Sequence, residues 1–347
     1  MPWQWISRVF HRDLSRVQKP VGERKKNDDN DIQPFEDRSV KLAIKSSKDL
    51  EQAFFCWLLN CTDDDLQCDS KALQDKEEGI LKILDQDVLG VDQLPRRPAS
   101  FPVLIKLLNS DNSSLTDISK ALLADPALAT QALKTANSPF FRASEDSIDS
   151  VDRAVFALGS QGVRNIISAT VMKPMMKGKD SKESVFSKKV WEWGLLSATA
   201  SDQYSTLQGR DPGPLYLLGL LPSLAYLVIY RALLIYQNKH PVSGELEPLL
   251  MKSIIQKRSW KLCHDICQQW GLPPSSNKYL LDAERPSPTS AFAPLRDGIL
   301  IASHKILQAC VCSPIDDINA FVLTSSPTTI DTKVAQHIDD RVKESLL

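Results

Sequence analysis

The chain has 347 residues, enough for one large domain with attached segments or for two domains. Its 42 Lys and Arg against 43 Asp and Glu leave a net charge of −1, which excludes the strong basicity of a dedicated nucleic-acid-binding protein, so no nucleic acid is expected as a partner. Hydrophobic residues at 42% and charged residues at 24% fit a soluble globular protein, and 13 Gly beside 21 Pro disfavour a strand-rich architecture. Seven cysteines without a disulfide-like spacing predict reduced thiols and a cytoplasmic location.

Residues 1–18 have the pattern of an amphipathic helix. Apolar side chains fall near one face, and arginines recur every four residues on the other. The segment is too short and too soon charged for a secretory signal. Its aromatic residues Trp3, Trp5 and Phe10 suit contact with a membrane surface or with a partner groove, whereas the blander alternative is a short helix docked on its own protein.

The next segments differ sharply in composition. Residues 19–46 hold a basic run followed by an acidic and polar run with few apolar residues, which predicts a flexible linker. Residues 47–92 follow, with apolar side chains at helical spacing behind Ser47, a residue able to cap a first turn. We therefore expect a helical extension there. At the other end, residues 312–347 predict a tail with a short helix that docks on the domain itself or on a partner.

Residues 93–311 read as a series of helices without alternating strand patterns, so the fold class is predicted to be all-α, a compact multi-helix domain. Helices are expected over 98–108, from Ser114 through Ala124, between Pro126 and Asn137, from Ser150, from Ser160 to Pro174, and over 184–206, 213–237, 245–256, 259–270 and 293–311. The uncharged stretch Pro212–Tyr230 approaches the length of a membrane span but holds several prolines and glycines, and it is interpreted as a buried central helix.

Several short segments, in order, together resemble the HDOD family, regulatory relatives of the HD metal-dependent phosphohydrolases in bacterial signalling proteins. The matching residues are Leu94, Pro95, Pro98; Asp125, Pro126, Ala127, Leu128, Leu133, Ala136, Asn137, Ser138; Ala154, Leu158, Gly159, Arg164; and Trp270, Gly271, Leu272, Pro273. The resemblance implies a compact helical sensor, scaffold or output module. By residue chemistry alone, Asp-Pro starts a helix and Asn-Ser-Pro ends one, so capping is favoured over ligand contact there.

The resemblance also indicates where a related hydrolase would hold its metal. Such a site needs histidines and aspartates that converge from separate helices. In this chain the corresponding positions are occupied by Trp193, Pro222, Ser223 and Ser303, and a further histidine position falls at Ser259 or Trp260. An indole has no lone pair for a metal, so no metal and no cofactor are expected, and hydrolysis at this site is predicted to be absent.

Other candidate sites are weaker. His264 and Asp265 form a literal His-Asp pair, but they lie beside the Trp-Gly-Leu-Pro segment and not in the central apolar helix. Cys263 and Cys267 share a helix face, and Cys310 lies two residues from Cys312, yet no Cys-x-x-Cys pair supports zinc, so buried apolar thiols are favoured. No nucleophile elbow, Walker loop or dinucleotide fingerprint is present.

The expected function is therefore a non-catalytic bacterial signalling or regulatory scaffold, a pseudoenzyme that binds another signalling protein. The alternative is a residual metal-dependent phosphohydrolase or a nucleotide-binding sensor, in which Trp191 and Trp193 stack on a base and Asn137 and Arg164 add contacts. Core packing is the favoured interpretation of both tryptophans. A third hypothesis is a cytoplasmic regulator that associates peripherally with a membrane through its N-terminal helix.

Overall fold

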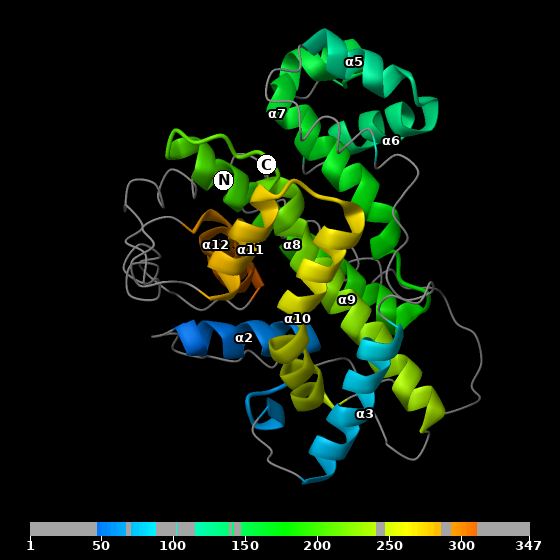
Figure 1. Cartoon of the computed structure of the whole chain (residues 1–347), viewed down its shortest axis with the longest axis vertical. Helices are drawn as coiled ribbons and strands as arrows, with labels where there is room; N and C mark the ends of the chain where they lie inside the picture. Colours follow the sequence, from blue (N-terminus) through cyan, green and yellow to red (C-terminus); the bar gives the residue numbers. More distant parts are fainter. Residues whose placement is uncertain are drawn as a thin grey trace, which may run out of the picture.

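The computed structural model describes residues 47–66, 71–87, 102, 115–138, 141, 147–240, 247–285 and 293–310. The helices are α2 (Ser47–Leu59), α3 (Lys71–Asp87), α5 (Leu115–Leu123), α6 (Pro126–Ala136), α7 (Val151–Met172), α8 (Ser181–Leu207), α9 (Leu215–Lys239), α10 (Pro248–Trp270), α11 (Ser275–Glu284) and α12 (Pro294–Cys310), with short 3₁₀ turns η2 (Asp64–Leu66) and η3 (Lys173–Met176). No strand occurs in these described ranges, and the predicted all-α class is confirmed. Figure 1 shows α5, α6 and the first part of α7 at one end of the molecule and α2 and α3 toward the other.

Helix α8 packs between α9 and α12 through small side chains. A Cβ atom added at Gly219 of α9 would lie 2.5 Å from the Cα atom of Ala198 in α8. A Cβ atom added at Gly298 of α12 would lie 2.5 Å from the backbone nitrogen of Ser201 in α8. Because the helix backbones approach this closely, α8 forms the centre of the core and positions the side chains of the candidate site.

Replacing Gly219 with alanine is expected to destabilise the protein by about 3 kcal/mol. The added methyl group meets backbone atoms of Ser197 and Ala198, which cannot rotate away as a side chain can, so α8 and α9 have to separate. Urea unfolding of both proteins measures the difference. A Gly219→Ala protein with unchanged stability would show that the two helices are not in backbone contact.

Helix α9 is long and apolar enough, by length and composition alone, to cross a bilayer. In the fold 78% of its most apolar window is buried inside the protein, as in the core helix of a soluble protein. The interpretation of Pro212–Tyr230 as a buried central helix agrees with this burial. The helix begins three residues later than that stretch, at Leu215, and continues to Lys239.

One helix boundary agrees with the sequence-based expectation and another differs. The segments predicted to start at Ser150 and Ser160 both lie in α7, and Gly159, with φ 67° and ψ 178°, interrupts the helical geometry between them. The predicted break between residues 256 and 259 is wrong, because α10 is continuous. The polar residues there continue the helix and face the N-terminal extension: Lys257 pairs with Glu77 of α3. Helix α11 was not expected at all.

Ion pairs and hydrogen bonds link the extension α2–α3 to α10. Lys76 Nζ lies 2.5 Å from Glu247 Oε1, and Arg258 pairs with Asp85. These charged groups are partly exposed, so the apolar contacts beneath them contribute more to the attachment of α3. Ile80 and Leu84 of α3 are buried in the same core as α9 and α10. The extension is therefore an integral part of the folded body.

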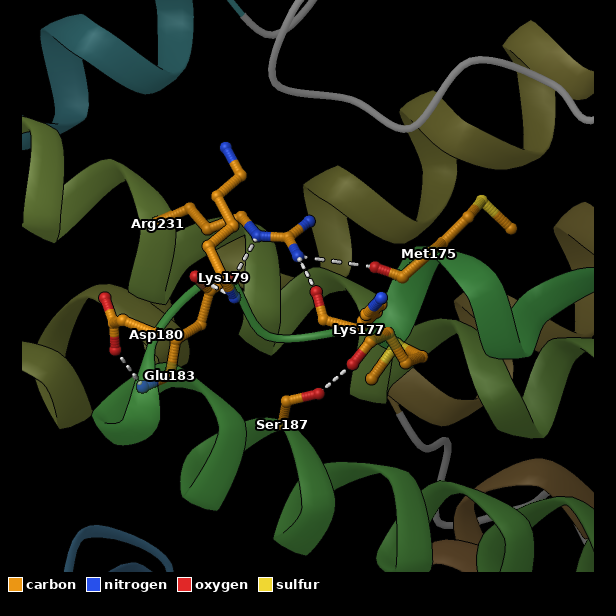
Figure 2. A network of polar contacts seen from close by, with 8 residues as sticks. Met175, Lys177, Lys179, Asp180, Glu183, Ser187 and Arg231 are labelled. Atoms are coloured by element: carbon orange, nitrogen blue, oxygen red, sulfur yellow. Dashed lines mark hydrogen bonds and ion pairs between the residues drawn. The ribbon is translucent and has the colours of Figure 1, made fainter.

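The start of α8 is fixed by a polar network around the buried Glu183 (Figure 2). The N-cap Asp180 accepts a hydrogen bond from Glu183 N, 2.8 Å, and Glu183 Oε2 accepts one from Lys179 N, 3.0 Å. Arg231 of α9 donates from Nε to Glu183 Oε1, 2.6 Å, and from its terminal nitrogen to the Lys177 carbonyl oxygen, 3.0 Å. One guanidinium thus joins α9, the η3 turn and the first turn of α8.

Candidate functional site

Trp193 is at the centre of the candidate site and is only 2% exposed. Its indole Nε1 donates a hydrogen bond to Ser303 Oγ of α12, 3.0 Å away. The indole ring stacks on Tyr226 of α9, with ring centroids 4.9 Å apart, and packs against Phe54 of α2 at 5.0 Å. Side chains from α2, α8, α9 and α12 therefore meet around one tryptophan, and its single polar atom is satisfied.

Ser223 lies against the residue that follows this tryptophan. A Cβ atom added at Gly194 would lie 2.6 Å from Ser223 Oγ, so the Ser223 side chain sits against the backbone of Gly194. Ser223 Oγ donates to the Leu220 carbonyl oxygen, 2.7 Å, and Pro222, which precedes Ser223, is buried within α9. The fold thus brings Trp193, Ser223 and Ser303 together, and Pro222 is the residue before Ser223 in α9.

The side chains at these four positions do not fit a divalent metal ion. Trp193 offers an N–H donor, Pro222 offers no ligand atom, and the hydroxyl groups of Ser223 and Ser303 already donate to carbonyl oxygens within their own helices. Ser303 Oγ in addition accepts the indole hydrogen. Across the described parts of the chain, no three His, Cys, Asp or Glu side chains are grouped so that they could hold a metal.

Glu192, between the two tryptophans, is a charged residue that no sequence pattern singles out. Its Oε2 atom is buried with no hydrogen-bond partner, and burial raises the pKa of its carboxyl group to about 7, against the opposing effect of Lys188 and Lys189. Trp191 is half-buried and packs against the core. An acid with this pKa can exchange a proton near neutral pH.

We expect Glu192 to make the protein less stable as the pH rises. The pKa of Glu192 is higher in the folded state than the unfolded value of 4.5, so the unfolded chain loses its proton first as the pH rises. Above pH 4.5, folding therefore requires the carboxyl group to take up a proton or to be buried with its charge, and either costs stability. Glu192→Gln should therefore match wild type near pH 4.5 and exceed it by about 1–3 kcal/mol at pH 8. Urea unfolding at both pH values tests this, with the exposed Glu78→Gln as control. Equal pH dependence in wild type and Glu192→Gln would contradict it.

Asn137 acts as a helix terminator. Its Nδ2 donates to the carbonyl oxygens of Leu133 and Ile148, 2.9 and 2.7 Å, and its Oδ1 accepts from Ile148 N, 2.8 Å. Asp125 caps the start of the same helix by accepting from Leu128 N. The capping interpretation of these residues agrees with these bonds, and the amide of Asn137 is fully used within the α6–α7 connection. Arg164 is buried in α7.

A second buried polar cluster links α7 to α8. Asp202 accepts from Gln161 Nε2, 2.7 Å, and from Asn165 Nδ2, 3.2 Å. Burial raises the pKa of Asp202 to about 6, although both amide hydrogen bonds lower it. Sequence reasoning missed this cluster because three polar residues from two helices show no spacing signal. The two hydrogen bonds to Asp202 join the second half of α7 to α8.

The His-Asp pair and the cysteine pair beside it all lie on α10. His264 Nε2 lies 3.2 Å from Glu284 Oε2 of α11, in a surface pair. Burial raises the pKa of Cys267 to about 11 and also raises that of Cys263, which favours neutral thiols that pack as apolar groups. The candidate contact residues Trp3, Trp5 and Phe10 lie outside the described residues.

A family model of the HDOD domain matches residues 94–286, more than half of the chain. The chain belongs to the HDOD domain family. The predicted boundaries of the segments around this domain stay predictions. Helix α12, which supplies Ser303, lies beyond the matched residues but packs along α8 in the same body.

Several solved structures have a similar fold. A candidate phosphohydrolase of Shewanella amazonensis SB2B is 18% identical with a TM-score of 0.54, covering 80% of this chain and 96% of that one. An HDOD domain protein of unknown function from Geobacter sulfurreducens is 17% identical with a TM-score of 0.55, covering 78% and 97%. A protein of Marinobacter aquaeolei VT8, described as a candidate signal transduction protein, is 18% identical with a TM-score of 0.51, covering 79% and 64%. At these identities the likeness shows the fold alone.

A curated relative from Treponema pallidum (strain Nichols), described as uncharacterized, is 21% identical over 224 residues. The match covers 62% of this HDOD chain but only 42% of that protein. The chain therefore spans less than half the length of this relative.

Proposed function

We propose that this HDOD protein is a non-catalytic regulatory protein that works by binding another signalling protein. The observation that carries the proposal is the packing around Trp193. An indole hydrogen-bonded to Ser303 and enclosed by Phe54 and Tyr226 fills the place where an HD hydrolase would need imidazole and carboxylate ligands. This buried aromatic packing supports a structural role for the region around Trp193. Binding of a partner protein is then expected at the exposed surface.

The exposed surface offers a side chain with which to test protein binding. Phe156 of α7 is 85% exposed, and a phenyl ring held in water gains free energy when a partner buries it. Because Phe156 contributes little to the core, Phe156→Ser should keep the wild-type melting temperature. Val185 of α8, 61% exposed, provides the matched control Val185→Ser.

The experiment is a comparison of the wild-type chain with these two variants in affinity purification from the native cell, followed by titration of the recovered protein. We expect a saturable protein partner whose affinity falls at least about tenfold with Phe156→Ser and is unchanged with Val185→Ser. A chain that retains no saturable protein partner, while it hydrolyses a phosphodiester such as bis(p-nitrophenyl) phosphate with Mn²⁺ or Ni²⁺, would overturn the proposal. A cytoplasmic location and peripheral membrane contact through residues 1–18 are part of the same proposal.

A further inference from the structure

The end of α2 brings two cysteines together. Cys61 N donates to the Cys56 carbonyl oxygen, 3.1 Å, across Asn60, which has a left-handed φ of 57°. A backbone bond of this span around a left-handed residue is a Schellman motif, in which the side chains of the first and last residues come into contact. At the ends of α8 and α10 the left-handed residue is glycine. Here the two contacting side chains are both thiols.

The two thiols interact directly. The Cys61 thiol donates a hydrogen bond to the Cys56 sulfur, which lowers the pKa of Cys56 and raises that of Cys61. The positive charges of Lys252 near Cys56 and of Lys189 near Cys61 favour the thiolates. The negative charges of Asp63 and Asp65 have the opposite effect: both raise the pKa of Cys56, and Asp65 also raises that of Cys61. The ionisations of the two thiols are therefore coupled. When one of them has lost its proton, the thiolate lies in contact with the sulfur of the other.

The loop that carries Cys61 is fixed against α2. Gln52 Nε2 of α2 donates to Asp63 Oδ1, 2.6 Å, and Thr62 donates to Asp65 Oδ2 from both its backbone nitrogen and its hydroxyl group, 2.8 and 2.7 Å. Cys56 is buried at 6% exposure, whereas Cys61 is half-buried. An oxidant can therefore reach Cys61 from solvent, whereas Cys56 is buried and less accessible.

We propose that Cys56 and Cys61 are a redox modification site that forms a reversible disulfide by exchange with a low-molecular-weight disulfide. Cys61, the more accessible sulfur, transfers the proton of its hydrogen bond to the Cys56 thiolate, and the resulting Cys61 thiolate attacks one sulfur of that disulfide and expels a small thiolate. Cys56 then gives its proton to the expelled thiolate, attacks the Cys61 sulfur of the mixed disulfide and expels the second small thiolate. Two protein thiols lose two protons and two electrons, and one small disulfide becomes two small thiols.

The position of this pair gives the disulfide a structural consequence. Phe54, two residues before Cys56, contacts Trp193, and Lys189 Nζ of α8 donates to the Trp57 carbonyl oxygen at 2.5 Å. A disulfide would thus restrain the C-terminal end of α2, the helix that places Phe54 against Trp193. This site is independent of the proposed function, since it requires neither a protein partner nor the absence of a metal.

The test oxidises the full-length Cys68→Ser protein, which lacks the next cysteine along the sequence, in buffers of reduced and oxidised glutathione. After acid quenching, unfolding and alkylation, chymotrypsin is used because it cleaves after Trp57 and Leu59 and so separates Cys56 from Cys61. We expect the two peptides to remain joined in most molecules at an oxidising ratio and to separate on reduction. Cys263 and Cys267, buried and four residues apart, should stay alkylated as the matched control.

Single variants test the order of attack. In Cys56→Ser the remaining Cys61 should take up glutathione at least about tenfold faster than Cys56 does in Cys61→Ser, because Cys61 is the more accessible sulfur. The proposal is overturned if Cys56 and Cys61 both remain alkylated at the most oxidising ratio, or if either is found joined mainly to another cysteine. The main measurement uses no substitution at the pair, so a folding defect in a single variant leaves it interpretable.

Discussion

Trp193→Ala should destabilise the protein by about 4 kcal/mol, one of the two largest effects we expect. The substitution removes a side chain that is 2% exposed and leaves a cavity between α2, α8, α9 and α12. It also removes the indole N–H group that donates a hydrogen bond to the Ser303 hydroxyl group. Trp193→Phe should cost about half as much, because it keeps the ring contacts with Phe54 and Tyr226.

Urea unfolding followed by circular dichroism measures these differences, with Trp191→Ala as the matched control. Trp191 is the neighbouring tryptophan and is only partly buried, so its removal should cost clearly less. If Trp193→Ala costs less than about 1 kcal/mol, the indole is not the packed centre of this site, and a cleft open to ligand would have to be considered.

Arg231→Met is expected to cost about 3–5 kcal/mol. Glu183 is 1% exposed, and without the guanidinium its charge would remain buried with a single backbone donor, from Lys179. The carbonyl oxygens of Met175 and Lys177 would also lose their donor (Figure 2). The η3 turn and the first turn of α8 should loosen together.

A double-mutant cycle separates the ion pair from packing. Arg231→Met combined with Glu183→Gln should recover a large part of the loss, since a neutral amide is far less costly to bury unpaired than a carboxylate. The control is Arg153→Ala, which removes an exposed pair with Asp149 and should change stability by less than about 0.5 kcal/mol. Additive losses in the cycle would mean that Arg231 and Glu183 do not stabilise each other.

Local signals predicted much of the helical framework. Asp125 and Ser150 each accept the first-turn hydrogen bond expected of a cap, and α2 begins at Ser47 as predicted. The predicted break in α10 failed because Lys257 and Arg258 interrupt the apolar pattern without interrupting the helix: their partners lie on α3, far away in sequence. Long-range pairing of this kind carries no local periodicity.

The resemblance named positions of the candidate site but not the side chains that surround them. The resemblance named Trp193 and Ser303, and the fold joins them by a hydrogen bond over 110 residues of sequence. Phe54, which contacts Trp193, belongs to the N-terminal extension and precedes the segments that carry the resemblance, which begin at Leu94, so the resemblance did not include it. Glu192 is distinguished only by its burial, which depends on how α8 is packed.

The most direct test of the account is the metal content of the purified full-length protein, measured by elemental analysis together with thermal melts. Melts are compared in Mn²⁺, Mg²⁺, Ni²⁺ and chelator, because a metal that binds only the folded state raises the melting temperature, and more so as its concentration rises above the dissociation constant. We predict less than about one tenth of a metal ion per chain and no metal-dependent shift, since the side chains around Trp193 supply no ligand set. A stoichiometric divalent metal, or a melting temperature that rises with one metal and falls with chelator, would contradict the account.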